Sequence, residues 1–169
     1  KIIIDPNNSD NIYVASQGPL WNSGGERGLY NSIDGGKTWL RILHVNNDTG
    51  ISDVVMDHDN NNIMYASTYQ RRRHFGIIVA GGPDGGIYKS VDKGKTWKKL
   101  KNGLPGGDLG RIGLAISPQK SNVVYALITA KKDTKGFYRS EDYGETWKKM
   151  SDYQVVDSQY YVEIFPDPN

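Results

Sequence analysis

The 169 residues of the chain are enough to build the core of one domain, and they carry a formal net charge of only +2. So small a charge gives no argument for a nucleic-acid partner or for an anionic membrane surface. Cysteine is absent, which excludes disulfide bonds and cysteine-ligated metal sites. No apolar run has the length of a membrane span. Glycine-rich turns between short aromatic and β-branched runs are typical of an all-β protein.

The chain shows a repeat of four short predicted strands, A to D, with a period of about 50 to 60 residues. The first unit has its strands near 1–5, 11–16, 28–33 and 38–43. The second has them near 52–57, 62–67, 86–91 and 96–100, and the third near 111–117, 122–128, 136–141 and 146–150. A further strand begins at Ile164. Repeated four-stranded units predict β-propeller blades, at about 1–50, 51–109 and 110–158, with the start of a fourth at about 159–169.

One motif, Ser-x-Asp-x-Gly-x-Thr-Trp, stands between strands C and D of every unit. Its serine and aspartate are expected to accept hydrogen bonds from the amides of a tight turn, and its glycine to adopt a positive φ. The tryptophan is expected to wedge between neighbouring blades. The defining positions are Ser32, Asp34, Gly36, Thr38 and Trp39, then Ser90, Asp92, Gly94, Thr96 and Trp97, then Ser140, Asp142, Gly144, Thr146 and Trp147.

This motif resembles the Asp-box, or bacterial neuraminidase (BNR) repeat. Together with segments 24–30, 52–57, 69–74 and 110–118, it is most similar to bacterial sortilin-type (Vps10) propeller proteins, which are often labelled glycosyl hydrolases. The expected fold is all-β, a β-propeller segment of three four-stranded antiparallel blades plus the first strand of a fourth, from a larger propeller. The partners expected for an open array are the remaining blades of a longer chain; the alternative is a fragment that closes by self-association.

A binding site is expected on the face formed by the B–C and D–A loops, because long loops concentrate function. The run of three arginines and a histidine at 71–74 is the sharpest feature there, since guanidinium groups bind carboxylates and phosphates. Neighbouring residues of an extended chain point to opposite faces, so the alternative is a solvated loop, or arginines paired with carboxylates of a neighbouring blade. The candidate ligand-binding residues are Trp21, Glu26, Arg27, Arg71, Arg72, Arg73, His74, Asp108, Arg111 and Tyr160.

The leading hypothesis is a non-catalytic propeller scaffold, extracellular or periplasmic, that binds a peptide, protein or glycan on this face or in the channel. In the sortilin-type resemblance the channel holds peptide segments. We expect no cofactor, no metal, no nucleic-acid partner and no membrane span in this segment, since His44, His58 and His74 do not have ligand spacing. The alternative is a sialidase- or xyloglucanase-like glycoside hydrolase, whose paired carboxylates would come partly from outside the segment.

Overall fold

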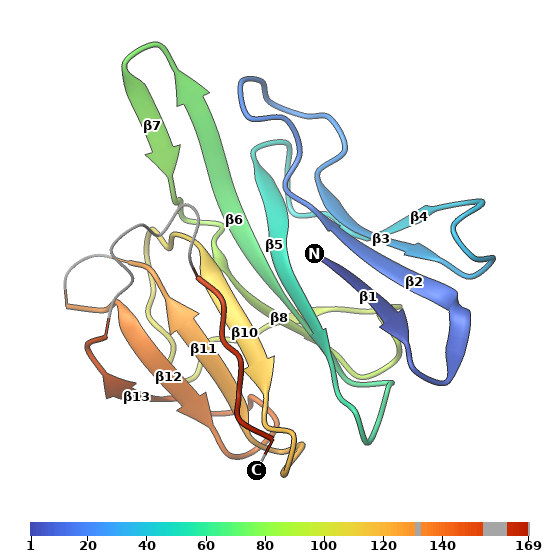
Figure 1. Ribbon diagram of the computed structural model, residues 1–169. Helices are drawn as coiled ribbons and strands as arrows, with labels where there is room; N and C mark the ends of the chain where they lie inside the picture. Colours follow the sequence, from blue (N-terminus) through green and yellow to red (C-terminus); the bar gives the residue numbers. More distant parts are fainter. Residues whose placement is uncertain (131–132, 154–161, 169) are drawn as a thin grey trace.

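The computed structural model describes residues 1–130, 133–153 and 162–168, which contain three antiparallel sheets (Figure 1). The first sheet contains β1 (Ile2–Asp5), β2 (Asn8–Ser16), β3 (Gly28–Ser32) and β4 (Leu40–Leu43). The second contains β5 (Thr49–Met56), β6 (Met64–His74), β8 (Gly86–Ser90) and β9 (Lys98–Lys99), with β7 (Ile77–Ala80) paired to β6. The third contains β10 (Ile112–Ile116), β11 (Val124–Ile128), β12 (Gly136–Ser140) and β13 (Lys148–Ser151). The prediction of an all-β chain of four-stranded antiparallel units is confirmed.

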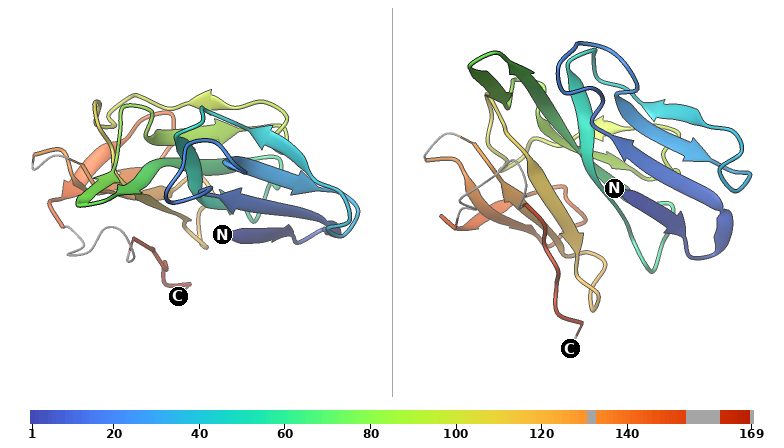
Figure 2. Two further views of the ribbon diagram at one scale, coloured as in Figure 1. Left: turned by 90° about the horizontal axis from the view of Figure 1, so that it is seen from above. Right: turned by 45° about the horizontal axis from the view of Figure 1, so that its top comes forward.

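The first strands of the three sheets, β1, β5 and β10, lie next to one another in the middle of the array (Figures 1 and 2). Each sheet is a meander, so its successive loops alternate between the two ends of the strands. The A–B turns and the motif loops lie at one end, and the B–C loops and D–A connections lie at the other. The final described segment, 162–168, runs alongside β10 (Figure 1) and contributes the buried Val162.

The second sheet differs from the prediction beyond Thr68, where a loop was expected as far as residue 85. β6 instead continues to His74 and forms a hairpin with β7. The turn is short because Gly76 adopts a φ of 74°, a left-handed conformation that glycine adopts without strain. This hairpin projects beyond the rest of the sheet (Figure 1).

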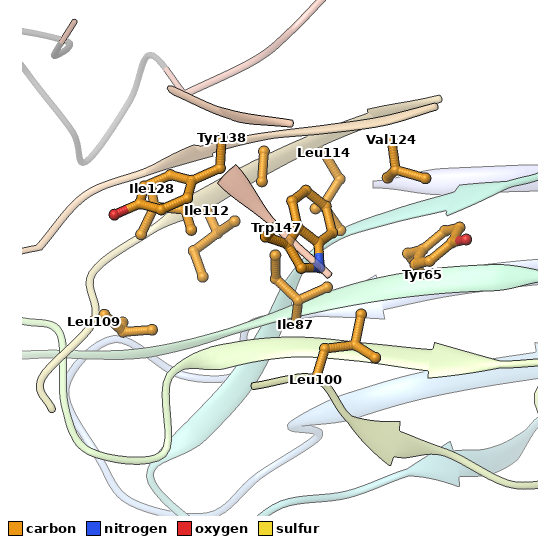
Figure 3. Packing of buried hydrophobic residues seen from close by; sticks show 11 residues of the cluster. Tyr65, Ile87, Leu100, Leu109, Ile112, Leu114, Val124, Ile128, Tyr138 and Trp147 are labelled. Carbon is orange, nitrogen blue, oxygen red and sulfur yellow. The ribbon is translucent and has the colours of Figure 1, made fainter. Parts of the chain in front are cut away.

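The middle sheet packs on both neighbours, which is why most of β5 and β6 is buried on both faces. On one side, Trp147 from the third sheet lies against Ile87 and Leu100 of the second sheet (Figure 3). Trp97 packs in the same way on the apolar cluster between the first and second sheets. Trp39, on the face of the first sheet that no sheet covers in this structure, is 43% exposed, whereas Trp147 is 6% exposed. The tryptophans of the second and third motifs therefore act as wedges between sheets, as predicted.

Polar contacts between the sheets follow the same repeat. The Tyr13 hydroxyl of β2 donates to the main-chain carbonyl of Lys93 at 3.3 Å, and the Tyr65 hydroxyl of β6 donates to that of Tyr143 at 2.8 Å. Both acceptors stand at the fourth position of a motif loop. Lys93 and Tyr143 have φ values of 59° and 56°, a conformation that is uncommon for residues other than glycine. The second strands of the first and second sheets thus contact the same position of the motif loop in the next sheet.

Each motif loop closes on its own side chains. In the second copy, Ser90 Oγ accepts from the amide of Gly94 at 2.8 Å, and Asp92 accepts from the Thr96 amide at 2.9 Å and from the Thr96 hydroxyl at 2.6 Å. The Trp97 indole donates to the Gly94 carbonyl at 3.0 Å. The other two copies make the same bonds. These bonds occupy both carboxylate oxygens of the aspartate, so the loop works as a turn and offers little to a cation.

Candidate functional site

The β6–β7 hairpin and the loop at 17–27 meet at the B–C/D–A end of the molecule. The main-chain amide of Arg73 donates to the carbonyl of Leu20 at 2.9 Å, which fastens the loop to the edge of β6 beyond the last residue paired with β5. Arg71 Nη1 donates to Gln17 Oε1 at 3.4 Å. The hairpin of the second sheet and the loop of the first therefore form one surface, which we call the hairpin face.

The three arginines do not act as one cationic cluster. The hairpin pairs them in register with Ala80, Val79 and Ile78, so that their side chains alternate between its two sides. Arg72 forms an ion pair with Asp48, which precedes β5 on the D–A connection from the first sheet. For Arg72 this confirms the interpretation that an arginine pairs with a carboxylate of the neighbouring blade. Arg71 and Arg73 are half-buried, and His74 is exposed.

Arg27 is a correction, because the prediction placed it on a ligand-binding surface and the structure buries it completely. Its guanidinium donates to the carbonyl of Gln17, to that of Pro19 at 2.6 Å and to that of Asn22 at 3.0 Å. Burial lowers the pKa of the guanidinium, and the nearby charge of Arg72 adds to the effect. Arg27 is the internal anchor of the 17–27 loop, and its side chain is out of reach of any ligand on the surface.

An exposed apolar group caps the hairpin face; of its members the sequence analysis selected Trp21 but not Phe75, Ile77 or Ile78. Phe75 at the tip is fully exposed, Ile77 and Ile78 are 61% and 52% exposed, and Trp21 on the adjoining loop is 60% exposed. The signal in the sequence is the unbroken apolar run from Phe75 to Ala80. The run lies within segment 68–85, which the sequence predicts as the loop between the second and third strands of its unit.

The other predicted site residues are dispersed. Glu26 is exposed and accepts a hydrogen bond from the Tyr30 hydroxyl at 2.6 Å. Asp108 is exposed on the connection between the second and third sheets. Arg111 is half-buried and interacts electrostatically with Asp53. Tyr160 lies outside the described residues.

Asp53 is a buried carboxylate on the central strand β5. It accepts from the main-chain amide of Leu114 at 3.0 Å and from that of Val54 at 2.9 Å, and so ties β5 to β10. Burial raises the pKa of Asp53, although those amides and the charge of Lys1 act in the opposite direction. The group is a structural tie between two inner strands.

Several carboxylates at the loop end are engaged by partners from within the chain. Asp84 accepts from the Asn46 amide at 2.8 Å, and Asp152 pairs with Lys149. Within 1–130, 133–153 and 162–168, no group of three or more histidine and acidic side chains is placed to hold a metal ion. None of the described segments forms a helix that is long and apolar enough to cross a membrane.

The inner strands border a groove of about 500 Å3. Its walls are largely apolar and come from β1, β5 and β10 and from the segment after residue 161; they include Ile3, Val55, Met56, Ala115, Ile164 and Phe165. This groove opens toward the middle of the array, where the inner strands of a propeller surround a channel.

The three meander sheets, packed side by side with their first strands innermost, are a segment of a β-propeller. Solved structures similar to this chain are an ancestral GH74 enzyme, at a TM-score of 0.66 and 19% identity, and the GH74 xyloglucanase of Xanthomonas campestris, at 0.63 and 21%. The likeness covers 94% and 89% of this chain but only 19% and 21% of those chains. At such low sequence identities, the structural likeness shows that the chains share a fold and shows nothing about function.

The family model of sortilin (neurotensin receptor 3), Sortilin-Vps10, matches residues 27–163. The chain belongs to this family. A curated relative, vacuolar protein sorting/targeting protein 10 of Colletotrichum graminicola, is 32% identical over 104 residues. The match covers 59% of this chain and 6% of that protein, so this chain corresponds to a small part of its relative.

Proposed function

We propose that this propeller segment is part of a non-catalytic, exported scaffold that binds a peptide or protein on its hairpin face. The observation that carries the proposal is the exposed apolar tip of the hairpin, formed by Phe75, Ile77 and Ile78, with the exposed Trp21 on the loop that is bonded to the hairpin at Leu20. Exposed apolar groups gathered at one place are typical of an interaction surface. Aromatic and aliphatic anchors of this kind supply much of the binding energy in protein complexes.

The hairpin is braced before any partner arrives. The bond from Arg73 to Leu20, the ion pair between Arg72 and Asp48 and the contact of Arg71 with Gln17 connect it to the first sheet. A surface held in place loses less conformational entropy on binding than a flexible loop. Arginine side chains beside an apolar tip favour a partner that combines apolar and acidic residues.

The test is selection of a displayed library of random dodecapeptides on the full-length protein. We expect enriched peptides with apolar and acidic residues, and we expect the substitutions Phe75→Ser and Trp21→Ala to weaken their binding at least tenfold. Ile33→Ser is the matched control, because Ile33 is 74% exposed in a motif loop at the opposite end. Equal binding by all variants, or by a variant lacking the charges of Arg71 and Arg73, would show that the hairpin face is not the site.

A separate assay for glycoside hydrolysis tests whether the protein is an enzyme. The fold is shared with GH74 enzymes, so a panel of β-glucan oligosaccharides, including xyloglucan, should be incubated with the full-length protein and analysed for cleavage. We expect no turnover. Hydrolysis of any member of the panel would overturn the non-catalytic assignment and favour the glycoside hydrolase.

We also propose that another blade covers the outer face of the first sheet. Trp97 and Trp147 show that this repeat places each motif tryptophan against the preceding sheet. Trp39 has the same position in its motif and is 43% exposed here. An additional unit of the same repeat would bury it in the same manner.

A further inference from the structure

A cavity of about 230 Å3 lies between the second and third sheets, separate from the hairpin face. Its walls include Ile87, Leu104, Leu109 and Ile112, of which Ile87 and Ile112 are fully buried. Figure 3 shows Ile87, Leu109 and Ile112 on the two sides of this region. Two lysines, Lys99 and Lys101, also border the cavity, and none of the described residues that line it is acidic.

Lys99 stands at a position that carries a basic residue in every sheet. The fourth strand places this residue opposite the tyrosine of the third strand, in the pairs Tyr30 with Arg41, Tyr88 with Lys99 and Tyr138 with Lys149. In the second sheet the stem of Lys99 crosses Gly86 so closely that a Cβ there would lie 2.5 Å from Lys99 Cε. The three sheets thus provide an internal comparison of one site.

Within the described residues, the basic residues of the first and third sheets form hydrogen bonds, and that of the second sheet forms none. Arg41 reaches the carbonyl of Arg27 at 3.5 Å, and Lys149 donates to the carbonyl of Asp133 at 3.0 Å and pairs with Asp152. Lys99 forms no hydrogen bond or ion pair with any residue of the described chain; its ammonium lies 5.9 Å from the centroid of the Tyr88 ring.

In the part of the chain that the structure describes, no carboxylate forms an ion pair with the ammonium of Lys99 at the cavity. The nearest acidic influence is Asp84, whose carboxylate already accepts from Asn46 at 2.8 Å. Burial lowers the pKa of Lys99, and the charge of Lys101 lowers it further, while Asp84 acts in the opposite direction. A bound anion would offset the desolvation cost of the buried ammonium and its electrostatic repulsion from Lys101.

We propose that this cavity binds a small apolar carboxylate, with the carboxylate on the ammonium of Lys99 and the apolar body against Leu104, Leu109 and Ile112. The volume fits this class of ligand, because an apolar cavity of about 150 Å3 already holds benzene. The space here accommodates a phenyl ring and a short chain that carries the charge. The proposal does not depend on the hairpin face.

The test is calorimetric titration of the full-length protein with 3-phenylpropionate and with its uncharged amide. We expect saturable binding of the acid and binding at least tenfold weaker for the amide, because a hydrogen bond between two charged groups is lost. Lys99→Met keeps the stem and removes the charge, and Leu104→Phe fills the cavity; each should weaken binding of the acid by about 10- to 100-fold. Lys95→Met is the control, since Lys95 is exposed in a motif loop at the opposite end and its loss should change nothing.

Two results would overturn the proposal. One is a protein with native circular dichroism that shows no saturable binding of 3-phenylpropionate at millimolar concentration. The other is equal affinity for acid and amide, or unchanged affinity in both Lys99→Met and Leu104→Phe. Loss of hairpin-face binding in Phe75→Ser with retained carboxylate binding is expected, because the two sites are separate.

Discussion

The hydroxyl of Tyr65 donates a hydrogen bond to the main-chain carbonyl of Tyr143 at 2.8 Å, and this bond joins the second sheet to the third. Tyr65 is fully buried, and burial raises the pKa of its hydroxyl. The phenol therefore stays protonated as a donor throughout the physiological range. Tyr13 and Lys93 make the equivalent contact between the first and second sheets.

Removing this hydroxyl should weaken the join between the sheets. We expect Tyr65→Phe to lower the free energy of unfolding by about 0.5–1.5 kcal/mol, because the partly buried hydrogen bond to the Tyr143 carbonyl is lost. Urea denaturation of the protein measures the change. Tyr125→Phe is the control: Tyr125 occupies the same position in the third sheet and its ring stacks on Phe137, but within the described residues its hydroxyl donates to no motif loop. Similar losses in both variants would mean that the hydroxyl contact contributes nothing specific.

The repeat made much of this architecture predictable from the sequence. Strands with buried and exposed residues in alternation, such as β2 and β12, were placed within a few residues. The motif loops followed from their turn chemistry, and Trp97 and Trp147 were correctly expected to lie between sheets. Periodicity and turn residues are local properties, so a single sequence contains them.

The candidate site was less predictable because it depends on contacts between distant segments. Arg27 looks like a surface residue in the sequence, and only the fold shows that the 17–27 loop wraps around its side chain. The hairpin was missed because the sequence after Thr68 lacks alternation, while its strands are stabilised by pairing with each other. The ion pair of Arg72 with Asp48 and the cavity at Lys99 both join segments that are distant in the chain, so no short stretch of sequence predicts them.

Acid should destabilise the protein through its motif loops. Hydrogen bonds, first from the Thr38 hydroxyl and amide, lower the pKa of Asp34 from 3.8 to about 2, and Thr96 does the same for Asp92. A carboxylate with a lowered folded-state pKa contributes stability above its ordinary pKa, and that stability is lost as pH falls through the folded-state value. We expect the melting temperature to fall between about pH 4 and about pH 2.

Substitution at Asp92 checks the origin of this acid response. Asp92→Asn should melt at a lower temperature than the parent at pH 7 and should show a shallower decline between pH 4 and pH 2, followed by scanning calorimetry. Asp108→Asn, at an exposed residue outside the motifs, should leave the profile unchanged. A parallel decline in the parent and in Asp92→Asn would assign the response to other groups.

The motif tryptophans should differ in importance according to what covers them. Trp147→Ala is expected to cost about 3–5 kcal/mol, since it empties a packed site between two sheets. In a chain limited to residues 1–169, Trp39→Ala should cost about 1 kcal/mol or less. If another blade covers Trp39, the same substitution in the full-length protein should cost as much as Trp147→Ala. Equal, small effects of Trp39→Ala in both proteins would contradict the covering blade.

Arg27 should be essential for the order of the 17–27 loop. Arg27→Met leaves the carbonyls of Gln17, Pro19 and Asn22 without their donor, and we expect a loss of about 2–4 kcal/mol. Amide hydrogen exchange should accelerate in the 17–27 loop before it does so in the motif loops. Arg41→Met is the comparison, since Arg41 is exposed and should have a small effect. Unchanged exchange in Arg27→Met would show that the loop is held by other contacts.

The joins between sheets have a direction. The tyrosine of a sheet's second strand donates a hydrogen bond to the motif loop of the following sheet. The tryptophan of that following sheet packs against the first of the two sheets. Such contacts are heterologous: the two surfaces of a unit differ, and units add head to tail. Duplication of one whole unit within a gene therefore adds one join of the kind already present. The array can therefore grow by internal duplication without a new type of interface. A unit inserted in the opposite orientation would present surfaces that do not match those of its neighbours.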